Sequence, residues 1–309
     1  MKIQIRSWKD WDSSWQEFIP LWNQNLAESF PITEILFERN LVANEWVNEE
    51  ASFVALENSR VVGFLVSKRD TEQGGCWISA ILVDKEFRGL GIGSGMLREF
   101  EQQMSGADVL VGMDPYHLFP GIPSERTETI RFFQSQGYQV EGSAYDLRTS
   151  ISDYAEKYPL QEGYSVRRLR EGEQSTLLSL IQANFSQRWY DDTLAFLRKD
   201  RRVDGTVGLF KEDALIGFAH VHTFNDGYIG PSIFWKELLK EKYGGLGPIG
   251  VAKEYQGKGL GTSYFEQIVL LLQKEGVEDM VVDWTILLNY YGKFGFQPWK
   301  QYTHASKKQ

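Results

Sequence analysis

Two glycine-rich loops, in corresponding places of the two halves, constrain this chain more than any other feature. They are Arg88-Gly89-Leu90-Gly91-Ile92-Gly93 and Gln256-Gly257-Lys258-Gly259-Leu260-Gly261. Each follows a short apolar run and precedes an amphipathic stretch, so each predicts a strand, a turn and a helix. Glycines let the backbone approach a ligand closely, and the start of the helix offers unpaired N–H groups. The loops therefore predict two binding sites for the diphosphate of a nucleotide cofactor.

The rest of the two halves repeats the same order of elements. Residues 3–6 and 164–167 both alternate like strand starts, and apolar residues at helical spacing follow each of them. Hairpins are then predicted at residues 53–64 and 207–218. Because 309 residues are enough for two domains of ordinary size, we predict an N-terminal domain at 1–149, a linker at 150–162 and a C-terminal domain at 163–309.

Two segments interrupt the repeat. Residues 114–126 form a proline-punctuated loop in the first half, and residues 225–245 form an insertion in the second half. A short helix is predicted around residues 233–242 of this insertion. Long irregular segments beside a cofactor site commonly contact substrate, and variable surface loops are an equally good interpretation.

Composition narrows the classes of partner. The net charge is −9 and no long basic run is present, so we expect no nucleic-acid partner. The longest aliphatic run, residues 268–272, is far too short to span a membrane. Cys76 is the only cysteine, which excludes an internal disulfide, and the first residues have no apolar signal core. We therefore expect a cytoplasmic protein, and Cys76 fits a small buried residue better than an acyl-carrying nucleophile.

The order of motifs resembles that of the GNAT superfamily of acyl-CoA N-acyltransferases. The likeness covers essentially the whole chain as two copies, and it is strongest in the second half, with its loop at 251–262 and the closing turn Tyr290-Tyr291-Gly292-Lys293-Phe294-Gly295-Phe296. The resemblance implies an α/β fold of two tandem GNAT-like domains that pack as a pseudo-dimer. Each domain would be a mixed, mostly antiparallel sheet flanked by helices. A dinucleotide-binding fold fits less well, because its glycines are spaced Gly-x-Gly-x-x-Gly.

The resemblance also implies acetyl-CoA as the co-substrate. In that family the loop amides hold the coenzyme A diphosphate, and the edge of the preceding strand pairs with the pantetheine arm. Carried over to this chain, the second site comprises Ile249, Gly250, Val251, Gln256, Gly257, Gly259, Leu260, Gly261 and Thr262. The first site comprises Ile81, Leu82, Val83, Arg88, Gly89, Gly91, Ile92, Gly93 and Ser94. No metal is expected, because His220 and His222 share a strand face without an evident third ligand.

The implied reaction is direct transfer of acetyl to the primary amine of a small molecule or peptide. For an amine of pKa ~10, removing the proton at pH 7 costs about 4 kcal/mol, and the leaving thiolate benefits from gaining one. In the family the tyrosine of the closing turn gives that proton, and Tyr291 occupies this position. In the first half the position holds Phe133, so we predict a catalytic second domain and a first domain that is non-catalytic or divergent.

Several alternatives stay open. Tyr291 also fits a core aromatic, and Trp284 stands where many family members have an asparagine. Asp283, Asp226 and Glu254 are candidate bases, with a water-relayed proton path as the default expectation. The rival functions are a coenzyme A-binding regulatory or scaffold protein without turnover, and transfer of another acyl group to a non-amine acceptor. The chain is expected to be a monomer or a homodimer.

Overall fold

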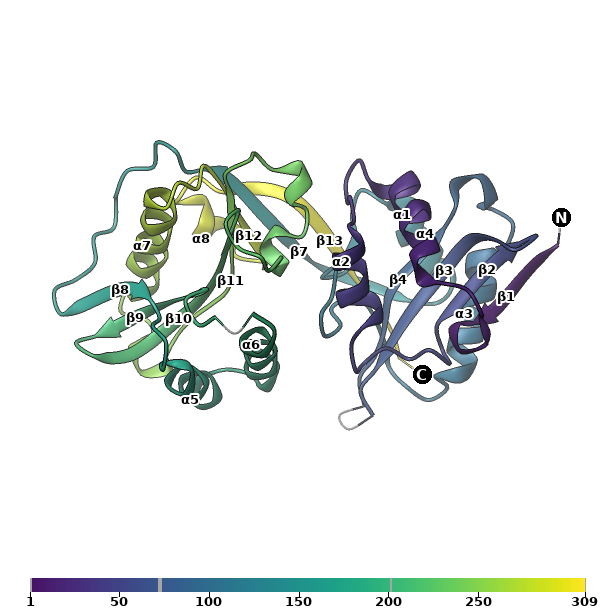
Figure 1. The fold of residues 1–309 in the computed structure, drawn as a ribbon, viewed down its shortest axis with the longest axis horizontal. Coiled ribbons are helices and arrows are strands. Elements are labelled where there is room, and N and C mark those ends of the chain that lie inside the picture. The colour runs from purple at the N-terminus through teal and green to yellow at the C-terminus, as the bar shows by residue number, and fades with distance from the viewer. Residues whose placement is uncertain (1, 72–73, 201, 309) are drawn as a thin grey trace. The chain divides into compact units, whose positions relative to one another are not determined.

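The structure is a computed structural model that describes residues 2–71, 74–200 and 202–308 (Figure 1). The chain divides into two compact units. The first comprises Met1–Ala144 and Lys300–Gln309, and the second comprises Tyr145–Trp299. Each unit is a mixed sheet flanked by helices, which confirms the predicted α/β class. No described helix is long and apolar enough to cross a membrane.

The sheet of the first unit is mostly antiparallel. Its strands, in spatial order, are β1 (Ile3–Ser7), β2 (Phe53–Glu57), β3 (Arg60–Arg69), β4 (Cys76–Val83), β5 (Val109–Val111) and β13 (Gln297–Lys307), and β6 (Ile122–Pro123) also pairs with β13. Its helices are α1 (Phe18–Leu26), α2 (Glu34–Phe37), α3 (Ile92–Gln103) and α4 (Thr127–Ser135), with a π-helical turn, η3 (Glu38–Val42), and 3-10 turns η1 (Trp8–Asp10), η2 (Trp15–Glu17) and η4 (Lys85–Phe87). The strands β4 and β5 run parallel.

The second unit repeats this plan. Its strands, in spatial order, are β8 (Tyr164–Arg168), β9 (Thr206–Lys211), β10 (Ala214–Thr223), β11 (Tyr243–Val251), β12 (Asp279–Thr285) and β7 (Gln139–Ser150). Its helices are α5 (Gln174–Asn184), α6 (Gln187–Asp200), α7 (Leu260–Lys274) and α8 (Leu288–Gly292), with 3-10 turns η5 (Pro231–Ile233), η6 (Lys236–Leu238) and η7 (Lys253–Tyr255). Here β11 and β12 run parallel.

The last strand of each sheet comes from the other half of the sequence. In the first unit, Ala305 of β13 pairs with Val111 of β5. In the second unit, Leu147 of β7 pairs with Val282 of β12. The predicted boundaries at 149, 150–162 and 163 follow the repeat in the sequence and stay a prediction. The compact units divide the chain differently, because an exchanged strand covers the open edge of each parallel pair.

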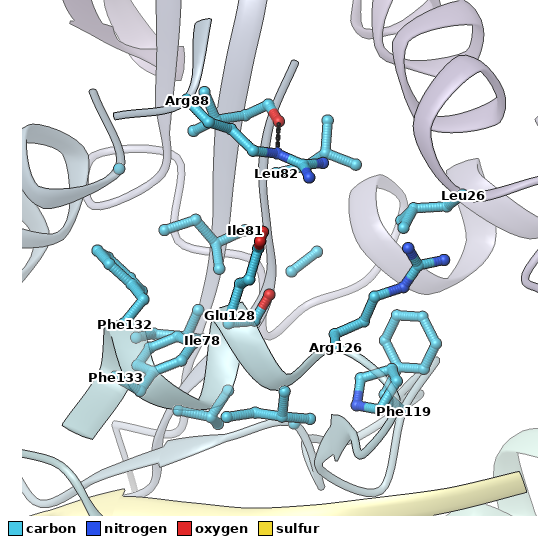
Figure 2. Close-up of a pocket in the computed structure, with 18 of the residues that line it drawn as sticks. Leu26, Ile78, Ile81, Leu82, Arg88, Phe119, Arg126, Glu128, Phe132 and Phe133 are labelled. Carbon is cyan, nitrogen blue, oxygen red and sulfur yellow. Dashed lines mark hydrogen bonds between the residues drawn. The ribbon is translucent and has the colours of Figure 1, made fainter. Parts of the chain in front are cut away.

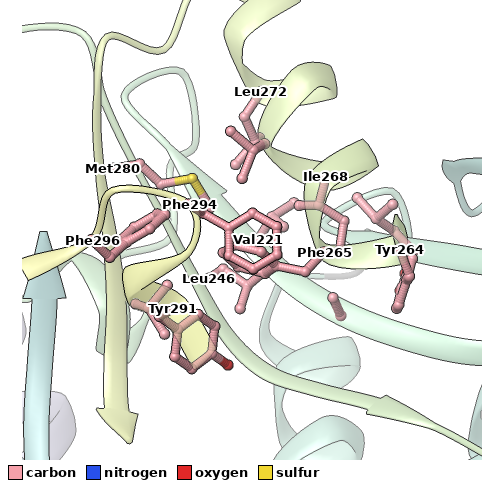
Figure 3. Close-up of a cluster of buried hydrophobic side chains, with 14 of the residues drawn as sticks. Val221, Leu246, Tyr264, Phe265, Ile268, Leu272, Met280, Tyr291, Phe294 and Phe296 are labelled. Atoms are coloured by element: carbon pink, nitrogen blue, oxygen red, sulfur yellow. The ribbon is translucent and has the colours of Figure 1, made fainter. Parts of the chain in front are cut away.

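Side chains that alternate along the central strands build an apolar layer on each face of a sheet. In the first unit, Phe64 of β3 stacks on Phe18 of α1 with ring centroids 4.6 Å apart, whereas Leu65 belongs to the core beneath α3. In the second unit, α7 and α8 pack on one face, around Phe265 (Figure 3). Phe218 packs with the aromatic residues of the α5–α6 layer on the other face. The strand period of two residues dictates this division.

The segment predicted as a linker is tied to the second unit. The buried carboxylate of Glu266 on α7 accepts hydrogen bonds from the Tyr154 hydroxyl at 2.6 Å and from the Lys157 backbone N–H at 2.8 Å. Burying a carboxylate is costly unless it is hydrogen-bonded, and these donors satisfy it. These hydrogen bonds therefore fix the irregular segment that contains Tyr154 and Lys157 along α7.

The short helix predicted around residues 233–242 is shorter and interrupted in the structure. Two 3-10 turns, η5 and η6, occupy residues 231–233 and 236–238. Three consecutive apolar residues, Ile233, Phe234 and Trp235, are all buried. An α-helix on a surface presents only one stripe to the core, so it cannot bury three successive side chains.

Candidate active site

The site of the second unit begins where its two parallel strands separate. β11 and β12 pair from Tyr243 and Asp279 as far as Leu246 and Val282. Beyond that point β11 continues to Val251, paired with β10 alone among the described strands. Residues 249–251 therefore present a strand edge with free backbone groups, which suits an extended ligand that pairs like a strand.

A left-handed glycine turn follows this edge in both units. Gly257 and Gly259 have φ values of 75° and 78°, and Gly89 and Gly91 have values of 77° and 78°. Gly259 and Gly91 are the N-caps of α7 and α3. A side chain is strained at such φ values, which explains the glycines. The first turn of each helix then directs amides and the positive end of its dipole outward, an arrangement that favours a doubly charged anion.

A cleft of about 480 Å³ joins the edge and the loop in the second unit. Of the predicted residues, those that line it are Ile249, Gly250, Val251, Gln256, Gly257, Gly261 and Tyr291. Gly259, Leu260 and Thr262 are not among its lining residues, and Leu260 is buried in the core. Phe185, Trp189 and Leu287 add apolar walls.

Tyr291 belongs both to this cleft and to the core. Its side chain is 4% exposed, and its ring lies 5.0 Å from that of Phe265. In Figure 3 its hydroxyl points away from Phe294 and Phe296. Burial, with smaller contributions from Tyr290 and Asp283, raises the pKa of the Tyr291 phenol. A phenol that stays protonated at neutral pH keeps a proton to donate.

Tyr290, the neighbouring residue, makes a hydrogen bond to the glycine loop. Its hydroxyl donates a 2.8 Å hydrogen bond to the backbone carbonyl of Gly261, in the first turn of α7. Burial raises its pKa to about 12. Tyr290 also lines the cleft, so both adjacent tyrosines reach it. The bond to Gly261 holds the closing helix against the glycine loop.

The first unit contains a larger cleft of about 790 Å³ (Figure 2). All the residues predicted for the first coenzyme site line it: Ile81, Leu82, Val83, Arg88, Gly89, Gly91, Ile92, Gly93 and Ser94. Arg88 Nε donates to the backbone carbonyl of Val83 at 3.1 Å, which fixes the start of the loop. Phe133 lines the same cleft and is fully buried.

Asp283, one of the three candidate bases, has surroundings that differ from those of the other two. It lies on β12, and its Oδ1 is buried with no hydrogen-bond partner among the described residues. Burial and the nearby carboxylate of Asp146 raise the pKa of Asp283 to about 8. The other candidates have ordinary surroundings, because Asp226 accepts a bond from the Thr223 N–H in a turn and Glu254 is exposed in η7.

Cys76 and His220 both lie in environments typical of residues with a structural role. Burial raises the pKa of the Cys76 thiol to about 11, so it is not a thiolate nucleophile at neutral pH. His220 is buried, with its ring nitrogens 2.9 Å from the hydroxyls of Thr193 and Thr206. Within the described ranges, no group of three His, Cys, Asp or Glu residues has the arrangement of a metal site.

Comparison with known families places an acetyltransferase domain in each half. A family described as "Acetyltransferase (GNAT) domain" matches residues 48–140, and one described as "Acetyltransferase (GNAT) family" matches residues 167–296. Together the matches cover more than two thirds of the chain. A comparison with curated proteins gave no significant match.

Solved structures share the fold over nearly the whole chain. A fungal multi-domain GH3 β-N-acetylglucosaminidase has a glucosamine N-acetyltransferase region that is 20% identical, with a TM-score of 0.86 over 99% of this chain. The chain spans 38% of the length of that protein. A GCN5-related N-acetyltransferase from Sphaerobacter thermophilus is 12% identical with a TM-score of 0.71, matching 99% of this chain and 95% of its own. A tandem GNAT protein of clavulanic acid biosynthesis is 15% identical with a TM-score of 0.67, matching 99% of this chain and 98% of its own.

Proposed function

Because the chain belongs to the GNAT family of acetyltransferases, in its tandem form, we propose that its second unit transfers acetyl from acetyl-CoA to a primary amine of a small molecule or peptide. One observation carries this proposal. Tyr291 lines the cleft between the free edge of β11 and the glycine loop, and Phe133 occupies the corresponding place in the first unit. At this position the second unit has a phenol to protonate the departing thiolate, whereas the phenylalanine of the first unit has no proton to give.

The coenzyme fits the second cleft by its chemistry. The amides of Ile249 and Val251 would pair with the pantetheine arm, and the loop amides from Gly257 to Gly261 would hold the diphosphate. The side chains of Gln256, Leu260 and Thr262 would shape the loop and the helix start, and Gly259 would supply the left-handed turn. Acetyl-CoA supplies an activated acyl group, and no metal is part of the proposal.

The reaction needs an amine nucleophile and a proton for sulfur. The amine attacks the thioester carbon to give a tetrahedral intermediate, whose collapse breaks the C–S bond. Tyr291 then donates its phenolic proton to the thiolate, and solvent restores it. An apolar rim formed by Leu287 and Ile286, which are 53% and 70% exposed, would contact the acceptor.

A second candidate function concerns the first unit. Its cleft is larger, holds every residue predicted for a coenzyme site, and has Phe133 instead of a tyrosine. These features favour a unit that binds coenzyme A without turnover. The catalytic proposal and this one are compatible for the whole chain, whereas a regulatory or scaffold protein would lack turnover in both units. A cytoplasmic location and a monomeric or homodimeric state remain parts of the proposal.

Titration calorimetry combined with thiol release tests the proposal. Acetyl-CoA is titrated into the full-length protein, and thiol release is followed over a panel of amines that includes glucosamine, the acceptor named for the fungal protein. We expect binding together with amine-dependent thiol release. Tyr291→Phe should lower kcat roughly a hundredfold while the Kd for acetyl-CoA stays near the wild-type value.

Two results would contradict the proposal. Binding of acetyl-CoA without thiol release for any amine would favour a binding protein. An unchanged rate in Tyr291→Phe would remove this tyrosine from the mechanism.

A further inference from the structure

Asp283 occupies a special position in the second unit. Leu246 and Val282 form the last pair of the parallel strands, and the residues that follow them are Gly247 and Asp283. Asp283 is therefore the first side chain of β12 beyond the point of separation. The free edge of β11, at 249–251, begins just beyond the same point.

The first unit differs at the corresponding position. There the last parallel pair is Ile78 with Val111, and Gly112 follows on the chain where the second unit has Asp283. The residue after this position has a positive φ in each unit, 61° at Met113 and 40° at Trp284. A bulky residue adopts such a φ only at a cost, so both strands bend sharply here. The bends are not identical, because Gly112 itself has a φ of 71°, whereas Asp283 has no positive φ. The units therefore differ at this position both in backbone conformation and in the carboxylate that only the second one carries.

Each element packed around Asp283 contributes differently to its surroundings. β11 presents Gly247, whose lack of a side chain leaves the space that Oδ1 occupies. β7 presents Asp146, whose Oδ1 accepts a 3.1 Å hydrogen bond from the backbone N–H of Trp284. α8 presents Tyr291, whose phenol interacts electrostatically with Asp283. Arg188 of α6, which forms an ion pair with Asp192 at 3.6 Å, lies 4.7 Å from the ring centroid of the neighbouring Trp284.

We infer that Asp283 is the general base of the second unit, and that Asp146, supplied by the exchanged strand β7, is a positioning residue that tunes it. This inference rests on the proposed acetyl transfer. It assigns the proton acceptor that sequence reasoning left to water. It also makes the catalytic pair, Asp283 and Tyr291, a property of the second unit, since the first has Gly112 and Phe133 instead.

Asp283 and Tyr291 together account for both proton transfers of the reaction. As the amine nitrogen bonds to the thioester carbon, one N–H proton passes to a carboxylate oxygen of Asp283. The C–S bond then breaks, and the thiolate takes the proton of the Tyr291 hydroxyl. Solvent carries the proton of Asp283 to the Tyr291 phenolate, so that both groups return to their starting states. The products are the N-acetylated amine and free coenzyme A.

This arrangement sets the pH dependence of the reaction. With a pKa of about 8, the Asp283 carboxyl is mostly protonated at pH 7 in the free protein and ionises as the pH rises. Once kcat/KM is expressed for the neutral form of the amine, its acidic limb should therefore have its midpoint near pH 8, because this parameter then reports groups of the free enzyme. Removing the negative charge of Asp146 favours the ionised form of Asp283. That midpoint should then move to lower pH by about one unit.

The experiment uses full-length variants whose acetyl-CoA binding is measured by calorimetry. Asp283→Asn is compared with Glu278→Gln, which removes a carboxylate that is 42% exposed and lies just before the same strand. We expect Asp283→Asn to lower kcat/KM at pH 8.5 at least a hundredfold and to abolish the acidic limb, with acetyl-CoA still bound. Glu278→Gln should keep the wild-type profile.

A second variant keeps the test informative where Asp283→Asn does not fold. In Asp146→Asn the base is intact, so the acidic limb should shift to lower pH while a maximal rate persists. A wild-type pH profile in either Asp283→Asn or Asp146→Asn would overturn the inference and leave the proposed function standing. Failure of the wild-type protein to release thiol with any amine would overturn both.

Discussion

Gly247 and Asp283 fit together across the two separating strands of the second unit. A Cβ added at Gly247 would lie only 1.8 Å from Oδ1 of Asp283. No real Cβ atom approaches an oxygen so closely, so a side chain at position 247 would displace the carboxylate. The absence of a side chain at Gly247 thus determines the position of the Asp283 carboxylate, the proposed base.

Gly247→Ala should therefore reduce catalysis by moving Asp283. We expect at least a tenfold fall in kcat and a loss of about 1–3 kcal/mol in the free energy of unfolding, as for other overpacked sites. Thiol release and urea unfolding measure the two effects. Gly227→Ala is the matched control, because a Cβ there meets no atom within 4 Å. Wild-type turnover in Gly247→Ala would mean that the position of Asp283 does not matter for the reaction.

The glycine loops offer a way to count the coenzyme sites. Gly91 and Gly259 have φ values of 78°, and a Cβ added to either would meet no other atom. Replacement by alanine therefore costs mainly backbone strain, about 1–2 kcal/mol, which should distort the turn that holds the diphosphate. Titration calorimetry should show weakened binding at one site in Gly91→Ala and at the other site in Gly259→Ala. If the protein has a single coenzyme site, one of the two substitutions will leave the titration unchanged.

The sequence was sufficient for the features that depend on local chemistry. The glycine spacing of residues 88–93 and 256–261 predicted the turn and the helix start, because only glycine adopts these φ values without strain. The aromatic closing turn likewise located Tyr291 and Phe133. Both predictions need only neighbouring residues and their backbone preferences.

Contacts between residues that are far apart in the sequence could not be predicted from local patterns. Asp283 was one of three candidate carboxylates, and nothing near it in sequence shows that Gly247 lies across from it or that Asp146 lies on the next strand. The proximity of Asp146 to Asp283 depends on the exchange of β7 and β13, which places residue 146 in the sheet of the second unit. The sequence repeat gives no sign of this exchange. The burial of residues 233–235 was also missed, because apolar residues in sequence do not reveal which surface they cover.

The stability of the second unit should depend on pH through His220. Burial lowers the pKa of His220 to about 3, whereas the ordinary value is 6.5. Below pH 6.5 His220 binds a proton in the unfolded chain but stays neutral in the folded protein. The free energy of unfolding therefore falls as the pH drops. Between pH 7 and pH 5 this loss amounts to about 2 kcal/mol. Urea unfolding at the two pH values measures it.

His220→Gln is the variant that isolates this effect. Glutamine does not titrate, and it retains groups that can bond to the hydroxyls of Thr193 and Thr206. We expect the variant to be less stable than wild type at pH 7 but to lose about 2 kcal/mol less on moving to pH 5. An equal loss in both proteins would show that His220 does not resist protonation.

The first unit should not become catalytic when it is given a tyrosine. Phe133→Tyr restores a phenol beside the larger cleft, but the unit still has Gly112 where the second has Asp283. Gly112 cannot be exchanged easily, since a Cβ there would lie 2.5 Å from the carbonyl oxygen of Phe119. The exchanged strand supplies His304 to this sheet, and burial lowers its pKa, so it is a neutral imidazole and not a carboxylate. In a Tyr291→Phe background, Phe133→Tyr should therefore recover none of the lost thiol release, and a rate restored to within tenfold of wild type would show that a phenol alone suffices.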